Sequence, residues 1–338
     1  MPSSVAAQST PDLSAYDLLA PQLSGGKDSA PMMAVFMTAA RAAGVDDRVI
    51  SYHSSLGPLE WPAVVFCGIR YPGVSELASL QSAAFGVPSS RHIEVTRTVP
   101  GPGGSRMPRS MLAEVAAYGR FPRLGSPFCR TYAKQSVVST AWTPIVRHLR
   151  EELGRPVRVL KIMGLRSEES RDRKKRPIFH RVLANSARVV DEWLPIKDWS
   201  TAAVKEWHAD APVPSCWTYD SVPGAGDWAG TSRCSCSLCV FASKHDVLLA
   251  LGRRPRLAAL YAEVEQARGD SFCASWRITD LIRHAALCGA PDPGVVCPDD
   301  GPEFTALEDQ VRAALQQEPR KEPKLARGAD RALCDGCS

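Results

Sequence analysis

Apolar and polar positions alternate between two spacings over the first hundred residues. Short apolar runs at 16–23, 48–52 and 92–96 are typical of strands, whereas segments 30–43 and 75–85 carry apolar residues at helical spacing. Strands that alternate with helices in this way predict a parallel α/β sheet. Because ligands of such sheets bind beyond the carboxyl ends of the strands, the residues that follow each strand are the first candidates for chemistry.

The same two spacings continue through the rest of the chain. Residues 157–163 predict a fourth strand. Further helices are expected at 111–118, from 128 towards 142, and at 201–209, 246–268, 278–287 and 305–316. Pro21 is awkward for a central strand because proline has no amide hydrogen, so we expect the first strand to end early.

These elements predict four regions. Residues 12–245 form the α/β domain and include a cysteine-rich loop, and residues 246–290 form a helical C-terminal extension. Residues 1–11 are expected to be a flexible tail, and residues 291–338 a Pro-rich, charged tail with one helix.

Composition narrows the class of protein. The chain has 338 residues, is 44% hydrophobic and 23% charged, and carries 41 Lys and Arg against 36 Asp and Glu. The net charge of +5 permits a nucleic-acid partner without indicating one. No apolar run approaches the ~20 residues of a membrane span, and the first residues do not resemble a signal peptide, so we expect a cytoplasmic protein with no membrane contact. Eleven cysteines in such a chain indicate metal, cluster or redox chemistry rather than a disulfide framework.

Two adjacent glycines follow the first predicted strand, in the sequence S-G-G-K-D-S. The six residues are Ser24, Gly25, Gly26, Lys27, Asp28 and Ser29. The glycines let the backbone approach a ligand closely, the amides at the start of the next helix favour an anion, and the hydroxyl and ammonium groups add donors. The segment therefore predicts a phosphate cradle, distinct from a Walker A loop, rather than an ordinary capped turn. Its aspartate is a candidate ligand of Mg²⁺.

Charged side chains also follow the second and fourth predicted strands. His53 ends the second strand, and Arg166 and Arg171 follow the fourth. Arginine binds phosphate through parallel hydrogen bonds, so Arg166 is the candidate for contact with nucleotide phosphates and, together with Asp28, for catalysis. Glu169 is expected to orient Arg166 or to cap the helix.

Three cysteines form a C-x-C-x-x-C run in an irregular segment: Cys234, Cys236 and Cys239. Thiolates at this spacing bind zinc or an iron–sulfur cluster. Cys129 is the distant candidate, because a predicted helix begins there and a helix N-terminus favours thiolate. Cys129, Cys236 and Cys239 are the ligands expected first. Cys234 and Cys236 do not easily serve one cluster together with Cys239, so one of the two is expected to be idle.

The spacing leaves the fourth ligand and the metal open. Cys234, Cys216 and Cys273 are the alternatives for the fourth ligand. Cys288 and Cys297 are spare thiols.

Together these segments resemble the PP-loop proteins of the adenine nucleotide alpha-hydrolase superfamily, and among them the PAPS reductase-like enzymes. The resemblance covers residues 23 to 287. Its motifs are S-G-G-K-D-S (24–29), H-S-S-L-G-x-x-E-W-P (53–62), F-C-R-T-Y-A-K (128–134), G-L-R-S-E-E-S-R (164–171), W-L-P-I-K-D-W (193–199) and C-x-C-x-x-C-V-F-A-S-K (234–244). The last motif looks most similar to proteins akin to the Dnd-type DNA phosphorothioation sulfurtransferase and to phage- or island-borne PAPS reductase-like proteins.

The resemblance implies a Rossmann-like fold, cleavage of ATP between its alpha and beta phosphates, and a [4Fe–4S] cluster held by the cysteine run and Cys129. The chain departs from the family in two places. Ser54 and Ser55 stand where the family has an acid after the histidine, and the chain ends C-D-G-C-S, with Cys334 and Cys337, instead of the E-C-G type of tail found in PAPS reductases.

Three functions follow from these residues. The first is an enzyme that adenylates a substrate with ATP and Mg²⁺ and assists sulfur transfer, with a nucleic acid as candidate substrate and a cysteine desulfurase or another sulfur donor as candidate partner. The second is a reductase of PAPS or APS; APS reductases carry a cluster but favour an adjacent Cys-Cys pair, which this chain lacks. The third is a non-catalytic nucleotide-sensing module, against which the intact S-G-G-K-D-S motif argues. The cysteine run favours the first.

Overall fold

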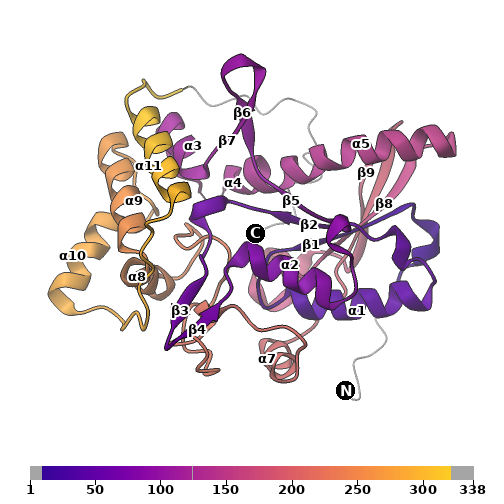
Figure 1. Ribbon diagram of the computed structural model, residues 1–338, viewed down its shortest axis with the longest axis horizontal. Coiled ribbons are helices and arrows are strands. Elements are labelled where there is room, and N and C mark those ends of the chain that lie inside the picture. The colour runs from indigo at the N-terminus through magenta and orange to yellow at the C-terminus, as the bar shows by residue number, and fades with distance from the viewer. Residues whose placement is uncertain (1–9, 124, 321–338) are drawn as a thin grey trace.

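A six-stranded sheet forms the centre of the computed structural model, which describes residues 10–123 and 125–320 (Figure 1). The strand order is β5-β2-β1-β8-β10-β9. The strands are β1 (Leu18–Leu23), β2 (Ser51–Ser54), β5 (His92–Val95), β8 (Val157–Met163), β9 (Phe179–Ala184) and β10 (Arg188–Trp193). All neighbours pair in parallel except β9, which runs antiparallel to β10 at one edge. The prediction of a mainly parallel α/β sheet is confirmed.

Helices cover both faces of this sheet (Figure 1). Alternate residues of β1 point to opposite faces, as strand geometry requires. Leu18 packs in a cluster with Trp142 on one face, and Leu19 packs in a cluster with Phe36 on the other. The covering helices are α5 (Ser136–Leu153) on the first face and α1 (Ser29–Ala42), α2 (Val74–Ala84) and α7 (Thr201–Ala209) on the second.

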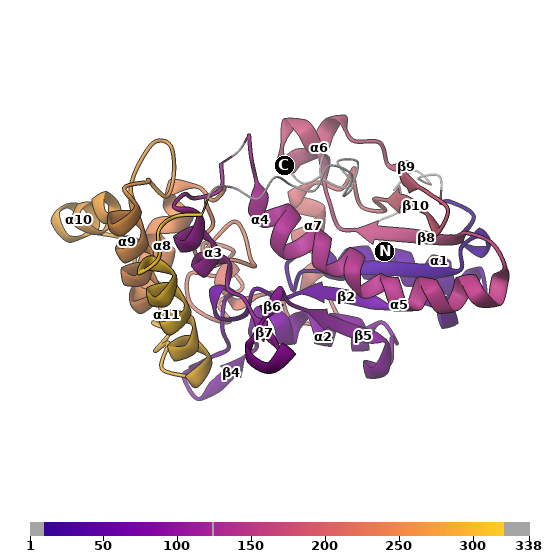
Figure 2. The same ribbon diagram turned by 90° about the horizontal axis from the view of Figure 1, so that it is seen from above.

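A third hydrophobic cluster lies beyond the carboxyl ends of the strands. Besides the start of α2 and the turn around Ala133, it joins five helices to the loops that follow the strands, and Figure 2 shows these five gathered at one end of the molecule. Trp61 and Trp217 meet edge to face at its centre, with ring centroids 5.4 Å apart. The helices are α3 (Met111–Tyr118), α8 (Lys244–Arg253), α9 (Pro255–Arg268), α10 (Ile278–Cys288) and α11 (Pro302–Leu315). The C-terminal helices therefore share one core with the loops of the sheet domain.

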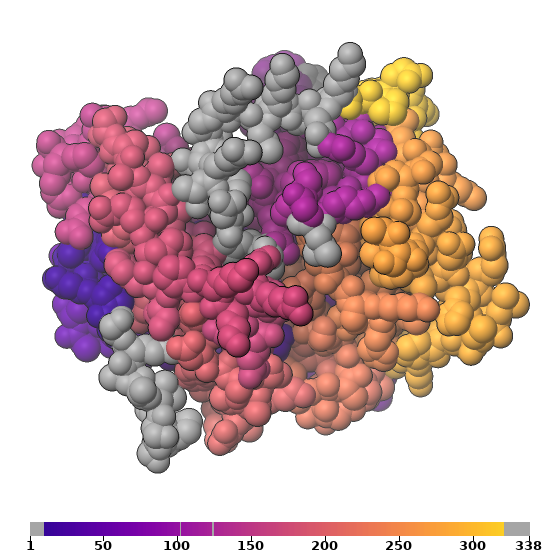
Figure 3. All heavy atoms as spheres, turned by 180° about the vertical axis from the view of Figure 1, so that it is seen from behind, coloured from indigo at the N-terminus to yellow at the C-terminus, as the bar shows by residue number. Residues whose placement is uncertain are grey.

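The remaining elements are short. Two hairpins stand outside the sheet, and a π-helical turn (Thr131–Gln135) joins α4 to α5. Seen from behind, the C-terminal helices (orange and yellow) occupy the side of the molecule opposite the first described residues, drawn in indigo (Figure 3). The short elements are β3 (Val64–Phe66), β4 (Ile69–Tyr71), β6 (Thr98–Pro100), β7 (Arg106–Pro108), α4 (Phe128–Arg130) and α6 (Arg171–Lys175). None of the helices in this described part of the chain is long and apolar enough to cross a membrane.

The expectation that Pro21 would end the first strand early is wrong. Pro21 pairs opposite Ile162 of β8, and β1 continues to Leu23. On its other side β1 pairs with β2 only through a bridge at Leu19 and then from Gln22 onward. The ladder is thus interrupted beside the proline, where the missing amide hydrogen leaves no donor.

Candidate functional site

The loop between β1 and α1 is shaped by its two glycines. Gly25 has a φ of +66°, and a Cβ there would lie 2.4 Å from the Val74 carbonyl oxygen, so only glycine fits. A Cβ at Gly26 would lie 3.1 Å from the hydroxyl of Tyr219 and 3.8 Å from Cys234 Cβ. The loop backbone is therefore in close contact with the segment that carries the cysteine run.

Hydrogen bonds from both sides fix the same loop. The Ser24 amide donates to Ser29 Oγ at 3.1 Å, and the two serine hydroxyls are 2.8 Å apart. The Lys27 amide donates to the Tyr219 hydroxyl at 3.0 Å, and Lys27 Nζ donates to the Ser232 carbonyl at 2.9 Å. The loop is thus clamped to residues 219–232, about 200 positions further along the chain.

Asp28 and Arg166 connect the loop after β1 to the loop after β8. Arg166 Nε donates to Asp28 Oδ1 at 2.6 Å, and the Arg166 side chain is only 2% exposed. Arg166 Nη1 also donates to Thr201 Oγ1 at 3.0 Å. Burial raises the pKa of the Asp28 carboxyl, against the opposing charges of Lys27 and Arg166. The guanidinium thus holds the aspartate, and its predicted contact with nucleotide phosphates stays a prediction.

Two glutamates support this pair. The Arg166 amide donates to Glu169 Oε2 at 3.0 Å, and Glu169 also pairs with Arg173, which confirms the expectation that Glu169 orients Arg166 or caps the helix. Glu168 accepts from the Thr201 amide at 2.7 Å and so ties the same loop to α7. Arg171 begins α6 and is exposed, and its predicted place in the nucleotide site stays a prediction.

His53 forms a buried pair with Glu60, a residue whose role the sequence did not reveal. His53 Nδ1 donates to the Leu23 carbonyl at 2.9 Å, and Nε2 lies 3.2 Å from Glu60 Oε2. Burial lowers the pKa of His53, but the hydrogen bond and the charge of Glu60 outweigh it and raise the pKa above its ordinary value. Both ring nitrogens lie within hydrogen-bond distance of an oxygen, and the ring joins the ends of β1 and β2.

The cysteine run is fastened to this pair through the backbone. Glu60 and Cys236 form an antiparallel bridge, the Trp61 amide donates to the Ser235 carbonyl at 3.2 Å, and the Ser237 amide donates to the Leu59 carbonyl at 2.8 Å. These bonds place the cysteine run directly after β2, beside the loop that carries Gly26.

Three of the predicted ligands interact electrostatically with one another here. The Cys236 thiol donates a hydrogen bond to the Cys239 sulfur, which lowers the pKa of Cys239 to about 6. Cys129, at the start of α4, interacts electrostatically with both, while burial raises its own pKa to about 11. Lys134 Nζ, 2.9 Å from Ser235 Oγ, also faces all three. The ammonium group of Lys134 is therefore placed to neutralise thiolates at this point.

Cys234 belongs to a second pair. Its side chain is hydrogen-bonded to that of Cys216, whose sulfur lies 3.3 Å from Thr218 Oγ1. Burial raises the pKa of Cys216, but the hydrogen bonds from Cys234 and Thr218 outweigh it and leave the pKa lowered. Cys273 lies in the loop between α9 and α10, and Cys334 and Cys337 lie outside the described residues.

Thiolates are the usual ligands of iron–sulfur clusters, and thiols from two distant segments interact electrostatically here with the ammonium group of Lys134. Across residues 10–123 and 125–320, no three His, Cys, Asp or Glu side chains stand in an arrangement that could hold a metal ion. The ligand set that the sequence predicted, Cys129, Cys234, Cys236 and Cys239, thus stays a prediction.

Comparisons with known proteins assign this chain to no family. Neither a scan against family models nor a search of curated proteins finds a match for this chain.

Proposed function

We propose that the chain is a PP-loop enzyme of the adenine nucleotide alpha-hydrolase type, in its PAPS reductase-like branch, that cleaves ATP between the alpha and beta phosphates and adenylates its substrate. The observation that carries the proposal is the contact of the S-G-G-K-D-S loop with the cysteine run, through Gly26 and Cys234 on one side and Lys27 and Ser232 on the other. A loop that binds anions and a set of thiols thus meet at the carboxyl edge of the sheet, where α/β folds bind ligands.

Each loop residue has a role in this reaction. The amides that follow Gly25 and the hydroxyls of Ser24 and Ser29 bind the phosphates, and Lys27 adds a positive charge. Asp28 would hold Mg²⁺, which when bound would supply positive charge to offset that of the departing pyrophosphate. Arg166 acts as a positioning residue because it fixes the Asp28 carboxylate across 2.6 Å.

The thiols serve sulfur transfer to the adenylated substrate. Cys129, Cys236 and Cys239 would hold a [4Fe–4S] cluster, with Cys234 or Cys216 as a fourth ligand. A bound cluster supplies iron that can take up sulfur. Lys134 stabilises the thiolate form of these ligands whether or not a cluster is bound. The substrate class that we propose is nucleic acid, with sulfur supplied by a cysteine desulfurase or another donor.

A second candidate function is the reduction of PAPS or APS. The Cys216–Cys234 pair beside Gly26 favours it, because two thiols that form a disulfide supply the two electrons needed to free sulfite from an adenylyl sulfate and release their two protons. The nucleotide product would then be the adenosine phosphate without its sulfonate group.

Pyrophosphate exchange tests the proposal and separates the two candidates. The full-length chain, prepared without oxygen, is incubated with ATP, Mg²⁺, labelled pyrophosphate and candidate nucleic acids. The expected result is incorporation of the label into ATP by the wild-type chain and no incorporation by the Asp28→Asn variant. Release of sulfite from PAPS or APS with no exchange would instead select the reductase. Binding of ATP with neither activity would leave a nucleotide-sensing module.

A further inference from the structure

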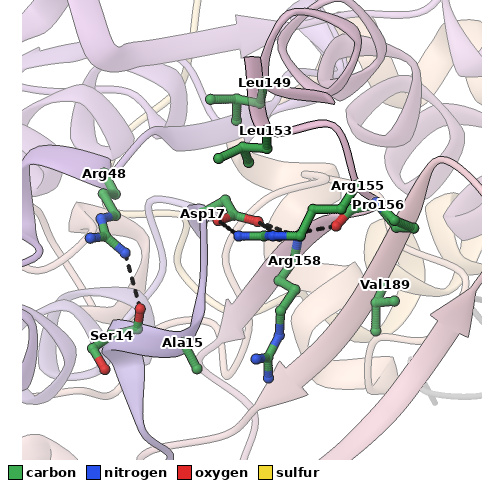
Figure 4. A pocket seen from close by; sticks show the side chains of 10 residues that line it. All are labelled: Ser14, Ala15, Asp17, Arg48, Leu149, Leu153, Arg155, Pro156, Arg158 and Val189. Carbon is green, nitrogen blue, oxygen red and sulfur yellow. Dashed lines mark hydrogen bonds and ion pairs between the residues drawn. The ribbon is translucent and has the colours of Figure 1, made fainter. Parts of the chain in front are cut away.

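The end of the sheet opposite the proposed active site carries two adjoining hollows lined by arginine. The first, of about 910 Å³, is formed by the N-terminal segment, the start of β8 and the end of α5 (Figure 4). The second, of about 420 Å³, lies against α5 and the start of β10. The two linings hold six arginines against two carboxylates, Asp17 and Glu151, and no lysine. The arginines are Arg48, Arg155, Arg158, Arg147, Arg150 and Arg188.

The two hollows are neighbours because α5 and β10 contribute to both, although no residue lines both. On α5, Leu149 and Leu153 line the first hollow, while Arg147 and Arg150 line the second. On β10, Val189 belongs to the first and Arg188 to the second. We call this surface the arginine edge. Its positive groups are thus spread over two hollows rather than gathered in one.

Half of these arginines have structural partners that hold the edge in shape. Arg155 makes two hydrogen bonds of 2.8 Å to Asp17, and Arg48 donates to the Tyr16 carbonyl at 2.8 Å. Arg188 donates to Ser139 Oγ at 2.7 Å. These bonds preorganise the backbone and the rim of both hollows.

The other three guanidinium groups stay available to a ligand. Arg147 and Arg150 are exposed. The Arg158 guanidinium packs over the Tyr16 ring at 5.2 Å, and only the backbone of Arg158, not its side chain, bonds to a residue drawn in Figure 4. In the described part of the chain, none of these three arginines forms an ion pair with a carboxylate, although Arg158 interacts electrostatically with Asp12. Guanidinium groups bind phosphate oxygens through paired hydrogen bonds. Arginine therefore suits a phosphodiester backbone better than lysine, whose ammonium group acts as a point charge.

We propose that the arginine edge binds the sugar–phosphate backbone of a nucleic acid. A single small anion would use one hollow, whereas a chain of phosphates matches guanidinium groups spread over both. The edge lies at the amino end of β8, and a strand of seven residues spans about 23 Å. A duplex that extends from the arginine edge to the proposed active site at the carboxyl end of β8 therefore covers at least about seven base pairs, since successive phosphates of one strand are about 3.4 Å apart along the axis. This inference deepens the proposed function by adding a docking surface for its substrate class.

Fluorescence anisotropy without ATP tests the inference separately from nucleotide cleavage. The full-length chain is titrated into labelled 20-residue single strands and 20-base-pair duplexes of DNA and of RNA, at several salt concentrations. Arg147→Glu with Arg150→Glu is expected to weaken binding at least tenfold and to reduce the slope of log affinity against log salt by about 2. Both positions are exposed on α5, so the variant should keep the wild-type unfolding midpoint.

A matched control places the same charge change at the other end of the molecule. Arg283→Glu with Arg312→Glu alters exposed arginines of α10 and α11 and is expected to leave affinity within about twofold of wild type. Equal loss in both variants, or none in the α5 variant, would overturn the proposal. So would binding of anionic phospholipid vesicles in place of nucleic acid. A preference for DNA or RNA would show which of the two nucleic acids the arginine edge binds. Because the assay contains no ATP, its result would hold even if the chain does not cleave ATP.

Discussion

Arg166 donates a hydrogen bond of 2.6 Å to the carboxylate of Asp28 and so joins the loops that follow β8 and β1. Both side chains are largely buried, with 2% and 14% of their surfaces exposed. Arg166→Met should therefore destabilise the fold by about 3–5 kcal/mol, because it leaves a buried carboxylate without its partner. Urea unfolding measures the change.

The matched control for that variant is Arg155→Met. Arg155 also pairs with an aspartate, Asp17, but its side chain is 48% exposed, so the expected loss is below about 1 kcal/mol. Arg166→Met combined with Asp28→Asn should recover part of the lost stability. Equal effects of the two arginine variants would show that the Arg166–Asp28 pair has no special structural role.

Gly25→Ala should abolish nucleotide binding. The new methyl group would lie 2.4 Å from the Val74 carbonyl oxygen, so the loop or α2 must shift. Gly44→Ala is the control, because Gly44 has nearly the same φ, +65° against +66°, and no atom within 4 Å of its would-be Cβ. The control should lose about 1–2 kcal/mol of stability and keep ATP affinity. Calorimetric titration with ATP measures both variants, and unchanged affinity of Gly25→Ala would remove the loop from the nucleotide site.

The thiols should hold iron. Chain purified without oxygen is expected to be brown and to contain about four irons per molecule. Cys239→Ser and Cys129→Ser should lose the colour and the iron, whereas Cys67→Ser, at an exposed cysteine of a hairpin turn, should keep both. Metal analysis and visible absorption provide the readout. Stoichiometric zinc without iron would instead indicate a structural zinc site.

Asp17 should make the fold sensitive to acid. Partial burial raises the pKa of its carboxyl, but hydrogen bonds from Arg155 and from the Arg158 amide outweigh this and bring the pKa below its ordinary value of 3.8. A lowered pKa in the folded state stabilises the fold above the unfolded pKa, and this stability is lost as the pH falls through the folded value. Asp17→Asn should therefore narrow the difference in unfolding free energy between pH 7 and pH 3, while Asp309→Asn, at an exposed position of α11, should not.

Local patterns predicted much of this structure. The bounds expected for β8, α3 and α7 agree with those observed, because each combines clear periodicity with a clear end, such as the Ser200 hydroxyl that caps α7. The hairpin of β9 and β10 was missed. Five of the six β9 residues are exposed or half-buried beside a basic run, so its alternation of apolar and polar residues is weak.

The candidate site was predicted only as far as its residues lie next to strands. The loop at 24–29 and the pair Cys236–Cys239 could be found from short spacings. Tyr219 and Ser232 could not, because they lie in an irregular Pro- and Gly-rich segment and reach the loop only through tertiary contacts. Cys216 was expected only as an alternative fourth ligand, and its hydrogen bond to Cys234 likewise depends on tertiary structure. Glu60 belongs to the H-S-S-L-G-x-x-E-W-P motif, yet its hydrogen bond to His53 depends on how the chain returns after β2.

The identity of the nucleotide products tests the central claim most directly. The full-length chain is incubated with ATP and Mg²⁺, with and without candidate nucleic acids, and the products are followed by phosphorus NMR. Cleavage between the alpha and beta phosphates predicts AMP, or an adenylated substrate, together with pyrophosphate, and predicts their loss in Asp28→Asn. Production of ADP and inorganic phosphate by the wild-type chain would contradict the account.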